Sequence, residues 1–158
     1  MNEAFYKFDP IAETGLEIPE ANRREALEAA ANFVKEQILL YSAEGKTSVA
    51  GGNWKKKLSD GYEHKKEEES SADFANLELT GAMMDALETR VQGGMVVVEV
   101  GGDQAAKAEG NLLGTYGRSS PHPEQAREFM PHRNGQQFRR EIIAGLRGVL
   151  EDYVDPDA

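Results

Sequence analysis

The sequence predicts an α+β domain, in which a small antiparallel sheet is packed by one helix from the N-terminal region and one at the C-terminal end. Two observations support this prediction. Apolar residues recur at helical spacing before and after the centre of the chain, and a strand–glycine–strand pattern lies between them at residues 89–100. A chain of 158 residues is long enough for one hydrophobic core. We therefore expect a single domain at residues 18–158, preceded by an arm.

The arm is predicted at residues 1–17, which show no helical or strand period. A purely disordered tail is usually poor in aromatic residues. This segment is rich in them, so we expect an extended arm that packs either on its own domain or on a neighbouring subunit. The candidate contact residues are Phe5, Tyr6 and Phe8.

The first helix is predicted to begin near Pro19, because proline suits the first turn and Glu20 complements the positive end of the helix dipole. Gly45 is expected to end it. The face that would meet the sheet is a stripe of apolar residues at Leu27, Ala30, Val34, Ile38 and Tyr41.

Residues 45–75 form the longest region without a period and are predicted to be a long mobile loop. The spacing of Trp54, Leu58 and Tyr62 predicts one short anchoring helix within it. Because tryptophan is costly to leave in solvent, we expect the loop to contact other subunits. The candidate contacts are Trp54, Lys55 and Lys56, and an acidic tract follows at Glu67, Glu68 and Glu69.

A short helix and a hairpin are predicted next. Leu77 precedes Thr80, whose hydroxyl suits a helix N-cap, and Gly81 follows it. The pair Gly93-Gly94 then separates two strands, since paired glycines supply the positive φ angles of a tight hairpin turn. The second strand is almost all valine, which predicts burial of at least one face.

The C-terminal region opens with an R-x-F-x-P motif formed by Arg127, Phe129 and Pro131. A final helix is predicted from Asn134 onwards, with its apolar face at Phe138, Ile142, Leu146, Val149 and Tyr153. We expect Phe129 to be buried beneath this helix and Pro131 to fix the entry of the chain into it.

No residue pattern predicts catalysis, a metal site or a cofactor. Cysteine is absent, which excludes disulfides and thiolate chemistry. The three histidines have no metal-ligand spacing, and 28 acidic residues offer many accidental carboxylate pairs. The turn at 100–103 lacks the rest of a phosphate-binding motif. The histidines are His64, His122 and His132.

The charge and hydropathy of the chain limit its partners. A net charge of −10 argues against a protein that grips nucleic acid by its phosphates, because such binding needs clustered Lys and Arg. The run Met95 to Val98 is too short to span a bilayer, and the first ten residues do not resemble a signal peptide. We expect a cytoplasm-like compartment and no membrane partner.

Three motifs in order resemble those of tailed-bacteriophage virion-morphogenesis and tail-completion proteins, which form the neck or head–tail connector. They are the W-K-x-x-L-S-x-x-Y segment at 54–62, the L-E-L-T-G-A-M segment at 77–83 and the R-x-F-x-P motif at 127–131. The resemblance covers roughly residues 18–153. The chain departs from the family in its acidic tract at 67–73 and at Glu128, where these proteins often have an apolar or small residue.

The resemblance implies a structural protein, not an enzyme. Such a subunit forms a homo-oligomeric ring, six- or twelve-fold, at the head–tail junction. Its partners are portal-side or adaptor-side connector proteins and tail tube or terminator proteins, and DNA passes through without specific binding. The protein is assembled in the host bacterial cytoplasm and resides in the virion.

Three other functions remain open at this stage: a terminator ring that caps the tail tube, a small glycan hydrolase, and an acidic monomeric binding protein. If DNA passes through a ring, acids that line the lumen would keep phosphate from sticking. The candidate lining residues are Glu67, Glu68 and Glu69, which would otherwise face solvent on the outside.

Overall fold

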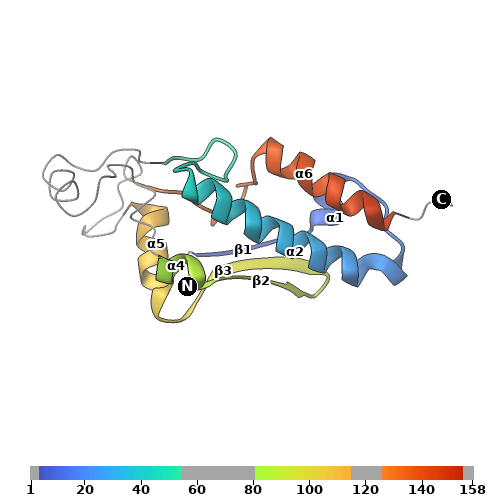
Figure 1. Ribbon diagram of the computed structural model, residues 1–158, viewed down its shortest axis with the longest axis horizontal. Coiled ribbons are helices and arrows are strands. Elements are labelled where there is room, and N and C mark those ends of the chain that lie inside the picture. The colour runs from blue at the N-terminus through green and yellow to red at the C-terminus, as the bar shows by residue number, and fades with distance from the viewer. Residues whose placement is uncertain (1–3, 55–80, 115–125, 155–158) are drawn as a thin grey trace, which may run out of the picture.

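The computed structural model describes residues 4–54, 81–114 and 126–154. It confirms the predicted α+β class: a small antiparallel sheet packs against a helical layer (Figure 1). The predicted elements at Leu58, Tyr62, Leu77 and Thr80 lie outside the described residues, as do the candidates Lys55, Lys56 and Glu67 to Glu69.

The sheet has three strands in the order β1-β3-β2, and both neighbouring pairs are antiparallel. The strands are β1 (Phe5–Phe8), β2 (Leu87–Gln92) and β3 (Met95–Val100). The predicted hairpin is confirmed, because Gly93 and Gly94 take φ angles of 59° and 73° in the turn between β2 and β3. The valine-rich β3 lies at the centre of the sheet, which explains its apolar sequence.

Of the two alternatives for the predicted arm at residues 1–17, packing on its own domain is observed, although the described residues are part of the domain and not a separate extended segment. Residues 5–8 form the third strand of the sheet, where Tyr6 lies opposite Val98 and Phe8 lies opposite Val96. Asp9 then caps the short helix α1 (Pro10–Thr14) by accepting two backbone N–H groups. Alternation along Phe-Tyr-Lys-Phe turns Tyr6 and Phe8 towards the core, and both rings pack on Phe138.

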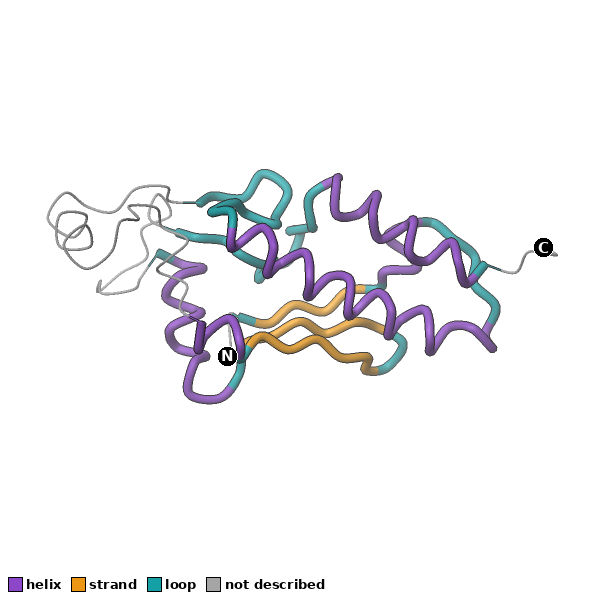
Figure 2. The backbone as a smooth tube through the Cα atoms, in the orientation of Figure 1, coloured by secondary structure: helices purple, strands orange, loops and turns teal. Residues whose placement is uncertain are grey.

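One face of the sheet is covered by the long helix α2 (Glu20–Ala43), as Figure 2 shows. Its buried residues form the predicted stripe, which includes Leu27, Ala30, Val34 and Ile38. On the other face of the sheet the outer-strand residues Phe5, Lys7, Glu88, Arg90 and Gln92 are exposed, whereas Val97 of the central strand is buried. No described helix is long and apolar enough to cross a membrane.

The last helix, α6 (Arg140–Leu150), packs along α2 and α1, and its buried residues are Ile142, Leu146 and Leu150. A 3-10 turn follows at Glu151–Tyr153. The helix begins at Arg140 and not after Asn134, because Gly135 takes a φ of 86° and Phe138 forms a β-bridge with Val49. Pro131 therefore does not fix the entry into this helix.

Three short helical segments lie at one end of the sheet. They are α4 (Gly81–Asp85), which precedes β2, and then a 3-10 turn (Gly102–Gln104) that leads from β3 into α5 (Ala105–Leu113). Gly81 thus opens a helix at the predicted place. Asn111 near the end of α5 is buried, and it contacts the R-x-F-x-P segment.

Candidate functional site

The R-x-F-x-P segment lies where several distant parts of the chain meet. Every residue from 126 to 132 is buried. Arg127 forms a β-bridge with Trp54, and its backbone N–H donates to the Asn111 carbonyl at 2.7 Å. The backbone N–H of Glu128 donates to the Asn53 carbonyl at 2.9 Å. The segment therefore joins the end of α5 to the chain that follows α2.

Two hydroxyl groups from the segment after α2 add further hydrogen bonds to the same junction. Ser48 Oγ donates to the carbonyl of Phe129 at 2.6 Å, and Thr47 Oγ1 donates to the carbonyl of Glu128. A second tie runs from residues 48–50 to residues 137–139, where the Arg139 N–H donates to the Ser48 carbonyl at 2.9 Å. The residues that precede α6 are thus held on both sides of the bridge between Val49 and Phe138.

The centre of this junction is the Glu128 carboxylate, whose side chain is 6% exposed. Oε1 accepts the Asn53 backbone N–H at 2.8 Å. Oε2 accepts Gln136 Nε2 at 2.7 Å and pairs with His132 Nε2 at 2.9 Å and Arg133 Nη2 at 3.3 Å. Four donors therefore meet one buried carboxylate.

The pKa of Glu128 follows from this environment. Burial raises it, but the hydrogen bonds from His132, the Asn53 backbone and Gln136 favour the ionised form more strongly, and together they lower the pKa to about 2. The carboxylate is thus ionised at neutral pH, and its charge is balanced by donors from both sides of the junction.

The His132 and Ser48 side chains of this cluster are both buried. The His132 side chain is 1% exposed, so its ring is closed to solvent, and Ser48 has its hydroxyl committed to a backbone carbonyl. Among the described residues, no group of three or more His, Asp or Glu side chains is arranged to hold a metal ion. The arrangement fixes the path of the backbone around Glu128.

Of the predicted motif residues that the structure describes, Trp54 and the three residues of the R-x-F-x-P motif come together here. Phe129 is fully buried, Pro131 is buried, and Arg127 donates through Nη1 to Asn111 Oδ1 at 3.2 Å. Trp54 and Phe8 were predicted to contact neighbouring subunits, and the structure contradicts this for both side chains. They are 8% and 4% exposed in the core of their own subunit, because Trp54 packs beside the junction and Phe8 packs on Phe138.

The sequence prediction missed Glu128 and His132. Their spacing of four residues is that of one helical face, yet the segment is not helical and Pro131 lies between them. The one signal was the departure at Glu128 itself, a charged residue inside an otherwise structural motif. Three of its donors, His132, Arg133 and Gln136, follow closely in the sequence, whereas the Asn53 backbone is brought to it only by the fold.

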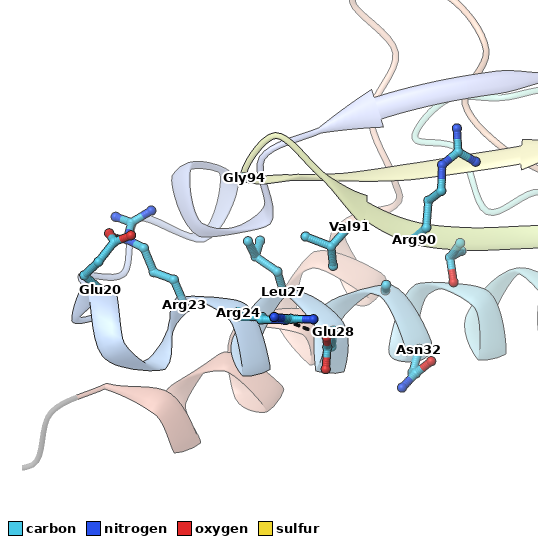
Figure 3. Close-up of a pocket in the computed structure, with 11 residues that line it drawn as sticks. Glu20, Arg23, Arg24, Leu27, Glu28, Asn32, Arg90, Val91 and Gly94 are labelled. Atoms are coloured by element: carbon cyan, nitrogen blue, oxygen red, sulfur yellow. Dashed lines mark hydrogen bonds and ion pairs between the residues drawn. The ribbon is translucent and has the colours of Figure 1, made fainter.

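Two surface grooves flank the open edges of the sheet. One, of about 770 Å³, lies between α2 and β2 and is drawn in Figure 3. It is lined by both apolar residues and arginines, including Arg23, Arg24 and Arg90. The other, of about 560 Å³, lies between β1 and the turn at residues 132–137, and Glu13 lies on its wall.

In comparisons with known protein families, with curated proteins and with solved structures, nothing matches the chain.

Proposed function

We propose that this chain is a structural subunit of a ring at the head–tail junction of a tailed bacteriophage, where it joins the capsid connector to the tail. The observation that carries the proposal is the burial of the R-x-F-x-P motif in the junction around Glu128. Its residues are buried in a junction that joins the end of α5 to the segment after α2, and this structural use of the motif supports a scaffold role.

The order of the three motifs supports the same proposal, since it resembles that of neck and tail-completion proteins. The two motifs at 54–62 and 77–83 lie mostly outside the described residues, so the R-x-F-x-P junction and the α+β architecture provide the structural support. In the described part of the chain the two outer edges of the sheet have no pairing partner, and they give such a subunit surfaces through which identical copies can associate.

The charge of the chain is consistent with a ring that DNA passes through. At a net charge of −10 the protein repels phosphate, so a lumen formed by it would not hold DNA. We propose that DNA passes without specific binding. The ring would contact connector proteins on the head side and tube or terminator proteins on the tail side, and would remain in the virion.

The test is assembly in vitro. Heads and tails made in cells that lack this chain should accumulate as separate particles, and addition of the purified protein should restore infectious phage. Antibody labelling should then mark the junction between head and tail. Tails of normal length that join heads equally well without the protein would overturn the proposal.

The same particles separate the neck from a tail terminator. A terminator stops growth of the tail tube, so its absence gives tails of irregular length. A neck subunit leaves tail length unchanged and prevents only joining. Measurement of tail lengths by electron microscopy in the absence of the chain therefore decides between the two positions.

A further inference from the structure

We infer that copies of this chain associate head to tail through the edges of their sheets, with β2 of one copy pairing in parallel with β1 of the next. The inference deepens the proposed function, on which its ring form rests, by assigning the surface between subunits. The partner on each edge is a second copy of this chain. Three observations carry the argument: the open edges, the strand directions and the charges beside them.

Both outer strands have an unpaired edge. The order β1-β3-β2 places β1 and β2 at the two sides of the sheet. In the described part of the chain, no hydrogen bond to another segment reaches the outer backbone edge of either strand. An exposed row of backbone N–H and C=O groups is a template for a further strand. Neither strand contains proline, which would block such pairing.

The strand directions define how the two edges meet. Both β1 and β2 are antiparallel to β3, so they run parallel to each other. The ends of β1 and β2 at Phe8 and Gln92 therefore lie at the same end of the sheet as the hairpin turn. When a second copy continues the sheet from β2, its β1 lies parallel to β2 and its α1 follows at that same end.

Opposite charges meet at this end. Arg23 and Arg24, in the first turns of α2, line the groove that Val91 and Gly94 also line, and in Figure 3 their side chains lie beside Glu20 and Glu28. On the other edge, Glu13 lies on α1, is exposed and forms no ion pair with the described residues. Because α1 packs against α2 and α6, it belongs to the helical layer, on the same side of the sheet as the arginines.

The arginines are available for a partner. Arg23 pairs with Glu20 at 3.5 Å and Arg24 pairs with Glu28 at 3.4 Å, and both are exposed pairs between neighbouring turns of one helix. Such pairs are worth little and exchange readily. A neighbouring Glu13 would therefore add an attraction between two copies that otherwise repel each other through their net charge of −10.

An interface between unlike edges leads to a ring. Each copy presents β2 and the arginines on one side and β1 and Glu13 on the other, so every copy can bind two neighbours. Interfaces of this kind generate closed rings when the rotation closes. A two-fold arrangement, in which β2 meets β2, would bring neither Arg23 nor Arg24 to a neighbouring Glu13, so it would gain nothing from this pairing of charges.

Cysteine cross-linking tests the pairing, because the natural chain contains no cysteine. Lys7 and Arg90 both lie opposite Val97, so they are level in the sheet, and both are exposed on the face away from α2. Mixing Lys7→Cys chains with Arg90→Cys chains under mild oxidation should give a disulfide heterodimer. Each variant alone should give none. As a control, Lys7→Cys chains are mixed with Glu36→Cys chains, whose cysteine lies on the exposed surface of α2. The yield of this mixture measures cross-linking by random collision.

A charge exchange tests the recognition. In the cysteine variants, Arg24→Glu alone or Glu13→Arg alone should lower the heterodimer yield about tenfold, and both changes in every chain should restore it. Thermal unfolding should be unchanged, because both side chains are exposed. The inference is overturned by a mixture that cross-links no faster than the Glu36 control, by homodimers of Arg90→Cys alone, or by a double exchange that fails to restore the yield.

These results are independent of the head–tail assembly test. Head-to-tail cross-linking together with normal joining of heads and tails in the absence of the chain would remove the phage function and keep the interface. Restored joining by a protein whose edges do not cross-link would keep the function and remove this interface.

Discussion

At the scale of single residues, Glu128 has the largest number of partners in the junction. One carboxylate accepts from the backbone after α2 and from the turn that leads to α6, so it links segments about 75 residues apart in sequence. A buried charge is tolerated only where donors replace its hydration. Here the donors outweigh the cost of burial, which is why the pKa of Glu128 falls below its ordinary value.

This pKa has a consequence for stability against acid. The folded-state pKa of about 2 lies below the ordinary value of 4.5, so the ionised carboxylate stabilises the fold above about pH 4.5. That contribution is lost as the pH falls towards 2. Glu128→Gln should cost about 1–3 kcal/mol at neutral pH, because it leaves buried donors unpaired.

The measurement is urea unfolding at a series of pH values. The free energy of unfolding of the wild type should fall more steeply between pH 5 and pH 2 than that of Glu128→Gln. Glu36→Gln, at an exposed position on α2, serves as the control and should keep the wild-type slope. Equal slopes for wild type and Glu128→Gln would show that the junction does not depend on the charge.

Phe129 carries the apolar part of the same junction. It is fully buried, and its carbonyl accepts the Ser48 hydroxyl. Phe129→Ala should reduce the free energy of unfolding by about 3–5 kcal/mol, the usual cost of removing a buried phenylalanine ring. Phe129→Leu, which keeps most of the apolar volume, should lose clearly less. A Phe129→Ala protein that melts with the wild type would show that the motif does not anchor the fold.

At the scale of elements, the contact between α2 and α6 depends on close approach. A Cβ atom built on Gly145 would lie 2.6 Å from Cζ of Phe33, whereas one on Gly148 would meet nothing within 4 Å. Both glycines lie in the same helix, α6. They form a matched pair that separates helix propensity from packing.

Alanine is favoured over glycine within a helix by about 1 kcal/mol. Gly148→Ala should therefore raise the free energy of unfolding by about that amount. Gly145→Ala should gain less or lose stability, because the Phe33 ring must move out of its packed position. Thermal unfolding of the two variants side by side measures the difference. An equal gain in stability for both would mean that the Phe33 ring can move aside without loss of packing energy.

At the scale of the whole molecule, the chain combines an ordered α+β core with a strong acidic excess. Its net charge of −10 weakens any association between copies unless opposite charges meet locally, as proposed for Glu13 and Arg24. The same charge makes the surface repel phosphate. In the proposed ring, assembly and DNA passage would depend on where the acidic residues lie.

The acidic tract at Glu67, Glu68 and Glu69 supplies a test of DNA passage. Changing all three to lysine should leave folding intact and slow DNA ejection, because phosphate would be held in the lumen. Changing all three to glutamine removes the charge without reversing it and should have a smaller effect. The measurement is the ejection rate of particles completed with each variant. Normal ejection with the lysine variant would place the tract away from the DNA path.

Local sequence signals predicted the elements that depend on neighbouring residues. The stripe of α2 and the Gly93-Gly94 hairpin follow from period and turn chemistry, so they could be located before the fold was known. The start of α6 was misplaced, because the Asn134 cap signal is local, whereas the bridge between Phe138 and Val49 is not. The burial of Phe129 was predicted from the motif and is confirmed.

By itself, then, the sequence determined the α+β class, the α2 stripe, the hairpin and the structural character of the R-x-F-x-P motif, since each is encoded within a short window. Only the tertiary structure decided that residues 5–8 complete the sheet, that Trp54 belongs to the core, and that the Asn53 backbone donates to Glu128. These features are contacts between residues far apart in the chain. These contacts stabilise the fold only when packing brings the distant segments together. A pattern within a short window of sequence therefore cannot predict them.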